Sequence, residues 1–259
     1  MQTDLLLAAK IAEAAANAAR PEILSRFRNV KSQSKDDGSP VTEADIAAEK
    51  TIRSILTEAF PDIPIKGEEL GGDTTGSRRY WIVDPIDGTL SFTRGIPLFG
   101  TLIALVEEGE TQVGLIDLPA LDERLLATRG GGTTMNGSPV RVSQEKQLEN
   151  AIISCSDNYC FDLWQARSML NRLVESVPKL RAYTDAFGHT QTICGRIDAM
   201  VDFALKDWDI APTRLLVEEA GGRCHQIDRS DRYDYGFGLI FGSPPLVEIL
   251  VDWFQELQI

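Results

Sequence analysis

Two aspartates three positions apart follow a short apolar stretch, and their carboxylates are the first candidates for chemistry. They lie in residues 81–89 (WIVDPIDGT), where Asp84 and Asp87 follow three residues of high strand propensity. We expect a buried strand that ends in a turn and presents both acids to a cleft. Two carboxylates at one spot repel each other unless a cation lies between them. Because hard oxygen ligands favour Mg²⁺, Mn²⁺ or Ca²⁺, the first hypothesis is a metal site.

Gly88 and Thr89 extend this hypothesis to an anion. Their backbone N–H groups lie where a helix can begin, and the start of a helix attracts anions. A cation and an anion site side by side indicate phosphate chemistry. The alternative from these residues alone is an ordinary polar loop between a strand and a helix.

Further acids each have a structural and a chemical interpretation. Glu68 and Glu69 end the short apolar segment 62–70; both are solvated turn residues, or one of them is a third acid of the cluster. Asp45 stands three residues after Thr42, so it is either the acid of a helix capping box or a carboxylate aimed at a water in the metal site. Asp209 opens a predicted helix, either as its N-cap or as a fourth acid beside the metal.

The elements that must position these residues fall into two groups. In residues 1–140 we expect an α+β part with an antiparallel sheet and the metal site; in residues 141–259 we expect an α/β part that completes the site. Residues 31–40 are polar and rich in helix breakers, and are either an exposed loop or a lid. The predicted helices cover 3–28, broken at Pro21, then 42–60, 162–177, 190–195, 209–220 and a segment from Pro244; the predicted strands cover 99–106, 112–118, 124–128, 151–156, 180–183, 199–203 and 237–242.

Composition limits the possible partners. The chain has 259 residues, with 26 lysines and arginines against 39 aspartates and glutamates, a net charge of −13. This balance argues against general binding to nucleic acid or to anionic membranes. The four scattered cysteines suggest reduced thiols and a cytoplasmic location, and we expect no signal peptide and no membrane span. The two histidines, His189 and His225, are interpreted as structural or surface residues.

Four motifs in order resemble the lithium-sensitive, Mg²⁺-dependent phosphatase superfamily of inositol monophosphatase-like proteins. They are residues 41–45 (VTEAD), 67–69 (GEE), 84–89 (DPIDGT), and 208–209 (WD) leading to 218–222 (EEAGG). They span most of the chain, and their combination is specific. The resemblance implies the layered αβαβα sandwich of this superfamily, an α+β or α/β fold that is usually a homodimer.

The resemblance also implies metal ligands. The side chains of Glu68, Asp84, Asp87 and Asp209 would hold Mg²⁺, and the carbonyl of Ile86 would add a ligand. Hydrolysis of a phosphate monoester needs positioning and neutralised charge rather than covalent work from the protein, so such a site suits it.

The remaining implied roles concern the water and the phosphate. Thr89, with Asp45 beyond it and Glu68 at the metal, would orient the attacking water. The amides of Gly88 and Thr89, next to Asp87, would hold the phosphate oxygens.

The substrate is indicated by a closer resemblance to one branch. Residues 78–103 and 185–188 (DAFG) look most like the histidinol-phosphate phosphatases, which tend to carry an acid at the position of Asp185 for the cationic end of the substrate. Asp202 falls where inositol phosphatases carry a substrate-contacting glutamate, and its shorter side chain disfavours an inositol ring. Two cleft acids suit the ammonium and imidazole groups of L-histidinol phosphate. Arg94 is a further candidate contact, to a substrate or to a partner subunit.

Several alternatives stay open at this point. The first is an inositol-1-phosphate phosphatase, and the second is a nucleotide 3′-phosphatase, which the acidic chain disfavours. The alternative of another class is a non-catalytic metal-binding or regulatory member of the fold. The missing G-x-x-x-x-G-K-[ST] motif argues against a P-loop NTPase.

Overall fold

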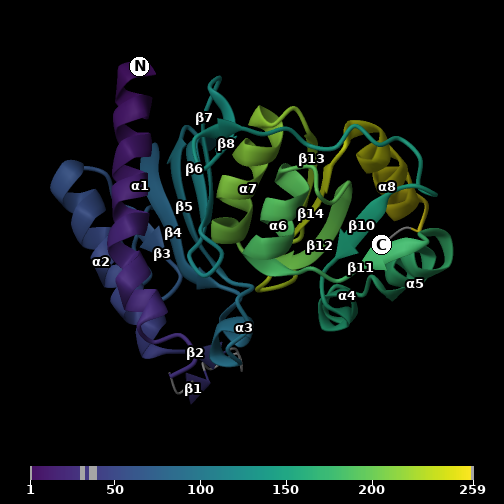
Figure 1. Cartoon of the computed structure of the whole chain (residues 1–259), viewed down its shortest axis with the longest axis horizontal. Helices are drawn as coiled ribbons and strands as arrows, with labels where there is room; N and C mark the ends of the chain where they lie inside the picture. Colours follow the sequence, from purple (N-terminus) through teal and green to yellow (C-terminus); the bar gives the residue numbers. More distant parts are fainter. Residues whose placement is uncertain (1, 30–32, 35–39, 258–259) are drawn as a thin grey trace.

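Five alternating layers of helix and sheet make up the structure (Figure 1). This computed structural model describes residues 2–29, 33–34 and 40–257. The layers are a helix pair, a seven-stranded sheet, a second helix pair, a five-stranded sheet and an outer group of helices. The predicted αβαβα sandwich is confirmed.

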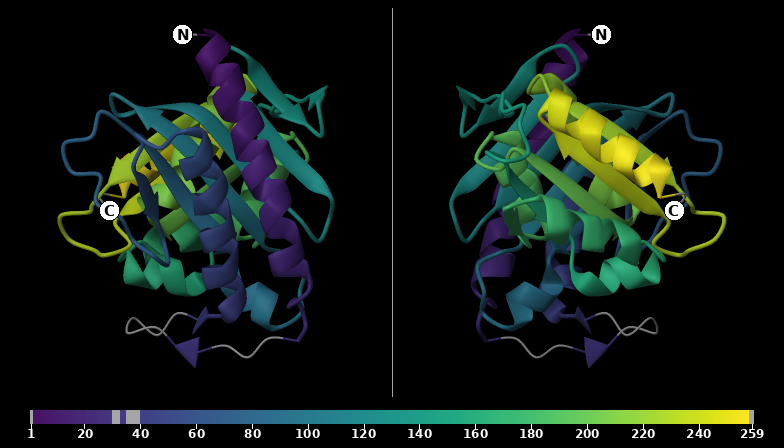
Figure 2. Two further views of the ribbon diagram at one scale, coloured as in Figure 1. Left: turned by 90° about the vertical axis from the view of Figure 1, so that its left-hand side faces the viewer. Right: turned by 90° about the vertical axis from the view of Figure 1, so that its right-hand side faces the viewer.

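The first layer contains α1 (Gln2–Leu24) and α2 (Glu43–Ala59), which lie side by side over the first sheet (Figure 2). Alanines dominate the buried face of α1, so the two helices and the sheet approach closely. The predicted break at Pro21 is wrong: the helix continues to Leu24, and Pro21 lacks only the one hydrogen bond that its own nitrogen would donate. The predicted cap of α2 is present, with Thr42 N donating to Oδ2 of Asp45 over 2.8 Å.

The seven-stranded sheet explains why the side chains of Asp84 and Asp87 point to the same face. Two residues three apart on a regular strand point to opposite faces. Here the pairing with the neighbouring strand shifts between them, so that Asp84 lies opposite Leu102 and Asp87 opposite Gly100. This bulge adds one residue and returns Asp87 to the face of Asp84. The strands, in spatial order, are β3 (Ile65–Gly67), β4 (Arg79–Asp87), β5 (Gly100–Glu107), β6 (Glu110–Leu118), β7 (Glu123–Thr128), β8 (Gly132–Met135) and β9 (Ser138–Pro139), antiparallel except that β3 is parallel to β4.

The five-stranded sheet is mixed and carries the outer helices on its far face (Figure 2). The predicted helix over 162–177 is wrong in one respect: it is two helices, separated where Gln165 adopts a positive φ of 53°. The strand over 223–228 was not predicted. The strands, in spatial order, are β11 (Lys179–Arg181), β10 (Ile152–Cys155), β12 (Ala199–Leu205), β14 (Phe237–Gly242) and β13 (Arg223–Asp228); the helices are α4 (Asn158–Leu163), α5 (Arg167–Ser176) and α8 (Pro244–Glu256).

The central layer, α6 (Asp185–Ile193) and α7 (Asp207–Glu219), packs between the two sheets. The far end of α7 is anchored to the first sheet, because the carboxylate of Glu219 accepts hydrogen bonds from the amides of Gly130 (2.7 Å) and Gly132 (2.8 Å). The 218–222 motif therefore fixes the helix that carries Asp209.

Short elements complete the fold near the cleft. They are α3 (Thr89–Thr93) and the paired strands β1 (Gln33–Ser34) and β2 (Pro40–Val41). Most of the segment 31–40, for which a lid was one interpretation, lies outside the described residues. Within the described part of the chain, every helix is too short or too polar to cross a bilayer.

Candidate active site

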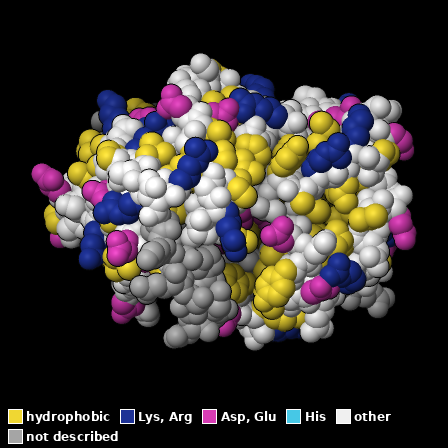
Figure 3. Space-filling model, turned by 60° about the horizontal axis from the view of Figure 1, so that its bottom comes forward, with side chains coloured by type: hydrophobic (Ala, Val, Ile, Leu, Met, Phe, Trp, Pro, Cys, Tyr) yellow, Lys and Arg dark blue, Asp and Glu magenta, His cyan; other side chains and the backbone are white. Residues whose placement is uncertain are grey.

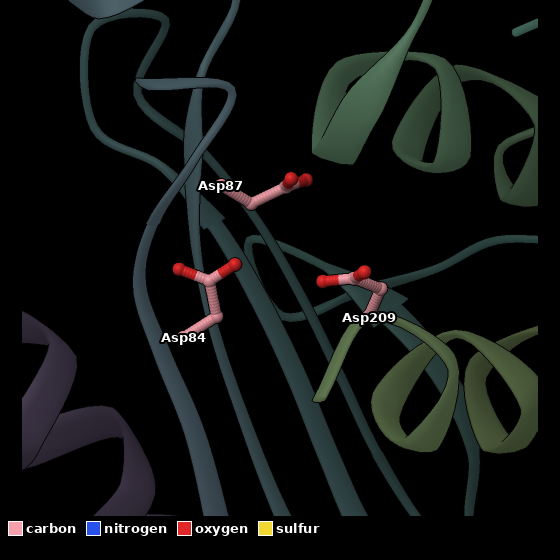
Figure 4. Close-up of side chains that lie close together, drawn as sticks. All are labelled: Asp84, Asp87 and Asp209. Atoms are coloured by element: carbon pink, nitrogen blue, oxygen red, sulfur yellow. The ribbon is translucent and has the colours of Figure 1, made fainter. Parts of the chain in front are cut away.

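Three aspartates from distant parts of the chain meet at one end of the central layer. Asp84 and Asp87 come from the end of β4, and Asp209 comes from the first turn of α7. One carboxylate oxygen from each lies within 4.8 Å of the others. Figure 4 shows the three side chains pointing toward one another. The convergence that the sequence could only suggest for Asp209 is present.

Burial and crowding destabilise the charged forms of these acids. Burial raises the pKa of Asp84 well above its ordinary value, and the neighbouring charges of Glu68 and Asp87 raise it further. The pKa values of Asp87 and Asp209 are raised as well, again chiefly by burial. Glu68 lies beside Asp84 and lines the same cleft. A cluster of this kind is stable as carboxylates only next to cations.

Thr89 connects the cluster to Asp45. Its Oγ1 donates to the carbonyl of Ile86 over 2.9 Å and lies 3.4 Å from Oδ1 of Asp45. Because Oδ2 of Asp45 accepts from Thr42, Oδ1 is the oxygen that faces Thr89. Asp45 is therefore the capping acid that the sequence predicted, and its second oxygen lies behind Thr89 rather than among the residues that line the cleft. The Ile86 carbonyl retains a second lone pair.

Gly88 occupies a position that only glycine fits well. Its φ is +82°, and a Cβ there would lie 2.8 Å from the carbonyl oxygen of Leu98. The turn therefore brings its backbone close to the wall of the cleft, next to Oδ2 of Asp185.

A second group of acids lies beyond the cluster. Asp185 opens α6 with a positive φ of 56°, and burial raises its pKa to about 6. The next amide, that of Ala186, donates to Oδ2 of Asp87, so α6 is tied to the first group. Asp202 lies on β12 and is almost fully buried. Asp157, two residues after the end of β10, completes this second group.

His189 is the residue whose position the sequence analysis missed. It is buried in α6 and also lines the cleft, where Nε2 lies 2.9 Å from Oδ2 of Asp202 and Nδ1 lies 2.7 Å from Oγ1 of Thr213. No local signal in the sequence reveals these contacts. Asp157 had a detectable signal, because an acid shortly after a parallel strand lies at the sheet edge where α/β proteins bind ligands.

Arg94 differs from the other candidates. It is exposed at the end of α3 and is not among the described residues that line the cleft.

The cleft, of about 270 Å³, is strongly acidic inside. Among the described residues that line it there is no lysine or arginine. On the end of the molecule turned forward in Figure 3, by contrast, charges of both signs are interspersed. An anionic substrate therefore needs bound cations to enter. The acidic residues of the lining are Glu68, Asp84, Asp87, Asp157, Asp185, Asp202 and Asp209.

Fold and site together define a class of phosphatases in which carboxylates gather at one end of the helix layer between two sheets. The sequence model described as Inositol monophosphatase family matches residues 4–248. A histidinol-phosphatase from Chlorobaculum parvum is 39% identical over 243 residues, which cover 93% of this chain and 92% of that protein. The chain belongs to the inositol monophosphatase family and is a phosphatase.

Other relatives carry different names. An inositol monophosphatase from Dictyostelium discoideum is 36% identical over 212 residues, covering 78% of each chain. The crystal structure of extragenic suppressor protein suhB from Bartonella henselae superposes with a TM-score of 0.84 at 29% identity, covering 94% of this chain and 96% of that chain. The family is therefore shown, and the names of its members do not agree on one substrate.

Proposed function

We propose that this chain is a Mg²⁺-dependent phosphomonoesterase that hydrolyses L-histidinol phosphate to L-histidinol and phosphate, a step of histidine biosynthesis in the cytoplasm. The observation that carries the proposal is the cleft lined by two groups of acids and by no lysine or arginine among the described residues. One group suits cations that hold a phosphate. The other suits a substrate that is itself cationic.

The first group fits Mg²⁺ by its chemistry. Its oxygens are hard ligands from three carboxylates within 4.8 Å, with Glu68 beside them. Glu68, Asp84, Asp87, Asp209 and the Ile86 carbonyl would hold the metal. When bound, Mg²⁺ lowers the pKa of a water and neutralises charge on the phosphoryl oxygens.

The residues of this chain supply the positioning. The hydroxyl of Thr89 orients the attacking water, and Oδ1 of Asp45, which lies behind this hydroxyl, takes up the proton of the water through it. The amides of Gly88 and Thr89 hold phosphoryl oxygens and fix the ester in line with this water. Burial of Asp45 excludes bulk solvent from its side of the site.

The second group selects the alcohol. Asp185 and Asp202, with Asp157 next to them, present negative charge to the ammonium and imidazole groups of L-histidinol phosphate. These carboxylates could also accept hydrogen bonds from the hydroxyls of an inositol ring, but a cationic group gains charge attraction in addition. Inositol 1-phosphate is therefore the alternative substrate, and a non-catalytic role is the alternative of another class. The expected homodimer belongs to the same proposal and is measured by light scattering on a gel-filtration column.

The test is release of inorganic phosphate from L-histidinol phosphate and inositol 1-phosphate, measured side by side with Mg²⁺ and with EDTA. We expect a kcat/KM at least about tenfold higher for L-histidinol phosphate, since one well-placed ion pair contributes on the order of 1.4 kcal/mol or more. A wide preference for inositol 1-phosphate would overturn the substrate. No hydrolysis of either ester would favour the non-catalytic alternative.

A further inference from the structure

Glu49 is a buried carboxylate outside the cleft that contacts the turn carrying Glu68. It lies on α2, one turn after Asp45, and its side chain is fully buried. Oε2 of Glu49 accepts from the amide of Glu69 over 2.8 Å, and the amide of Leu70 lies 3.3 Å from both oxygens. The acid therefore binds the two amides that directly follow Glu68.

Arg53 extends this contact to the other side of the same turn. Its Nε donates to Oε1 of Glu49 over 2.7 Å, so the buried carboxylate has a charge-assisted bond to a partly exposed guanidinium. The same guanidinium donates to the carbonyls of Ile65 (3.3 Å) and Gly71. One ion pair thus holds residues before and after Glu68.

Gly67 shows that the turn is built around this pair. A Cβ on Gly67 would overlap Oε1 of Glu49, so the glycine of the 67–69 motif leaves room for the acid. Its amide donates to the carbonyl of Gly71 over 2.8 Å, and the amide of Glu68 donates to the carbonyl of Val83 over 3.1 Å. The backbone of the Glu68 turn is therefore held by side chains of α2, by the carbonyl of Val83 on β4, and by the hydrogen bond between Gly67 and Gly71 inside the turn.

We infer that Glu49 and Arg53 are positioning residues that set where the Glu68 carboxylate stands, and so set the affinity of the site for Mg²⁺. The inference rests on the proposed metal role of Glu68. It ties Glu68 to Asp45, because both are then placed by the same helix.

The test is the affinity for Mg²⁺ without substrate, measured by titration calorimetry on Glu49→Gln. Glutamine keeps the size of the side chain, but its amide group donates and cannot accept from Glu69, Leu70 and Arg53 together. We expect the Kd for Mg²⁺ to rise about tenfold, the range seen when groups that orient metal ligands are changed. Arg53→Lys, which keeps the charge but reaches fewer carbonyls, should give a smaller rise in the Kd for Mg²⁺. It replaces Glu49→Gln as the test variant if Glu49→Gln does not fold.

The matched control is Asp117→Asn. Asp117 is also a buried carboxylate paired with arginines, Arg20 and Arg124, and none of these three residues lines the cleft. A rise in Kd for the Glu49 and Arg53 variants but not for this control supports the inference. An unchanged Kd, or equal rises that follow the loss of Tm in all three, overturns it. If the wild-type chain itself binds no Mg²⁺, the proposed metal site fails, which is a different result.

Discussion

Nε2 of His189 lies 2.9 Å from Oδ2 of Asp202, and both side chains are buried at the wall of the cleft. This contact takes up one oxygen of Asp202 and leaves the other for the cleft. The opposite ring nitrogen contacts Thr213, whose hydroxyl donates to the carbonyl of Asp209 over 3.0 Å. The histidine therefore links Asp202, of the second acid group, to α7, which carries Asp209.

Replacing this histidine should weaken substrate binding more than turnover. In His189→Ala, Asp202 loses a buried partner, which costs about 1–3 kcal/mol of stability and frees its carboxylate to turn. We expect KM for L-histidinol phosphate to rise about tenfold with a smaller change in kcat. His189→Gln, whose amide can donate to Asp202, should recover part of the loss. Steady-state kinetics and thermal unfolding measure both effects, and a fall in kcat alone would contradict them.

Removing a metal ligand should abolish activity and leave the fold intact. In Asp84→Asn, the side-chain oxygen still accepts from the amide of Ile86, as Oδ1 of Asp84 does over 3.0 Å, so local geometry is kept. We expect kcat to fall by about three orders of magnitude or more, because charge neutralisation of the phosphate is lost. Phosphate release and circular dichroism test this, and substantial retained activity would show that Asp84 is not a ligand.

The clustered acids should make the metal-free protein less stable as pH rises. The folded-state pKa values of Asp84, Asp87 and Asp209 are raised, so folding takes up protons between the ordinary value of about 4 and the raised values. This contribution to the free energy of unfolding is full below about pH 4 and is lost as pH rises through the raised values. Mg²⁺ should restore stability at neutral pH, since it binds the ionised acids.

The measurement for this pH effect is the Tm of wild type and of Asp209→Asn in EDTA, from about pH 5 to pH 8. The Tm of the variant should rise relative to that of the wild type as pH rises, because the variant lacks one of the repelling charges. Addition of Mg²⁺ should raise the Tm of the wild type more than that of the variant. A gap between the two proteins that stays constant with pH would argue against clustered charges as the cause.

Neutralising the second acid group should reduce discrimination between substrates. In Asp185→Asn, the charge facing the cationic end of L-histidinol phosphate is lost, so its kcat/KM should fall about tenfold or more. The value for inositol 1-phosphate should change little or improve. Asp252→Asn, an exposed acid on α8, is the control and should leave both values unchanged. Equal losses of kcat/KM for both esters would indicate that Asp185 does not discriminate between their alcohol groups.

The sequence predicted the layers and the acids but not the local structure that brings two of the acids together. The capped helix and the meander were recognisable because local patterns determine them: Thr42 with Asp45, and alternating strands with turn residues. Asp84 and Asp87 were expected to share a cleft through a turn after the strand, whereas both lie within β4 and share a face through a shift in pairing between two strands. Such a shift is set by tertiary packing rather than by the residues that it moves.

The remaining differences have the same origin. His189 gains its position from contacts with Asp202 and Thr213, which are distant in sequence, and no spacing rule connects the three. The break at Gln165 occurs where a non-glycine residue adopts a left-handed conformation, which helix propensity does not indicate.

Asp209 reaches Asp84 and Asp87 only because α7 lies between the two sheets, so the cluster cannot form until the second half of the chain has been synthesised and folded. While the ribosome is still making the second half, the nascent chain lacks Asp209 and so lacks one of the three clustered acids. On the proposed role of these acids, metal binds only after the sandwich has closed, and a product truncated before Asp209 is expected to be inactive rather than partly active.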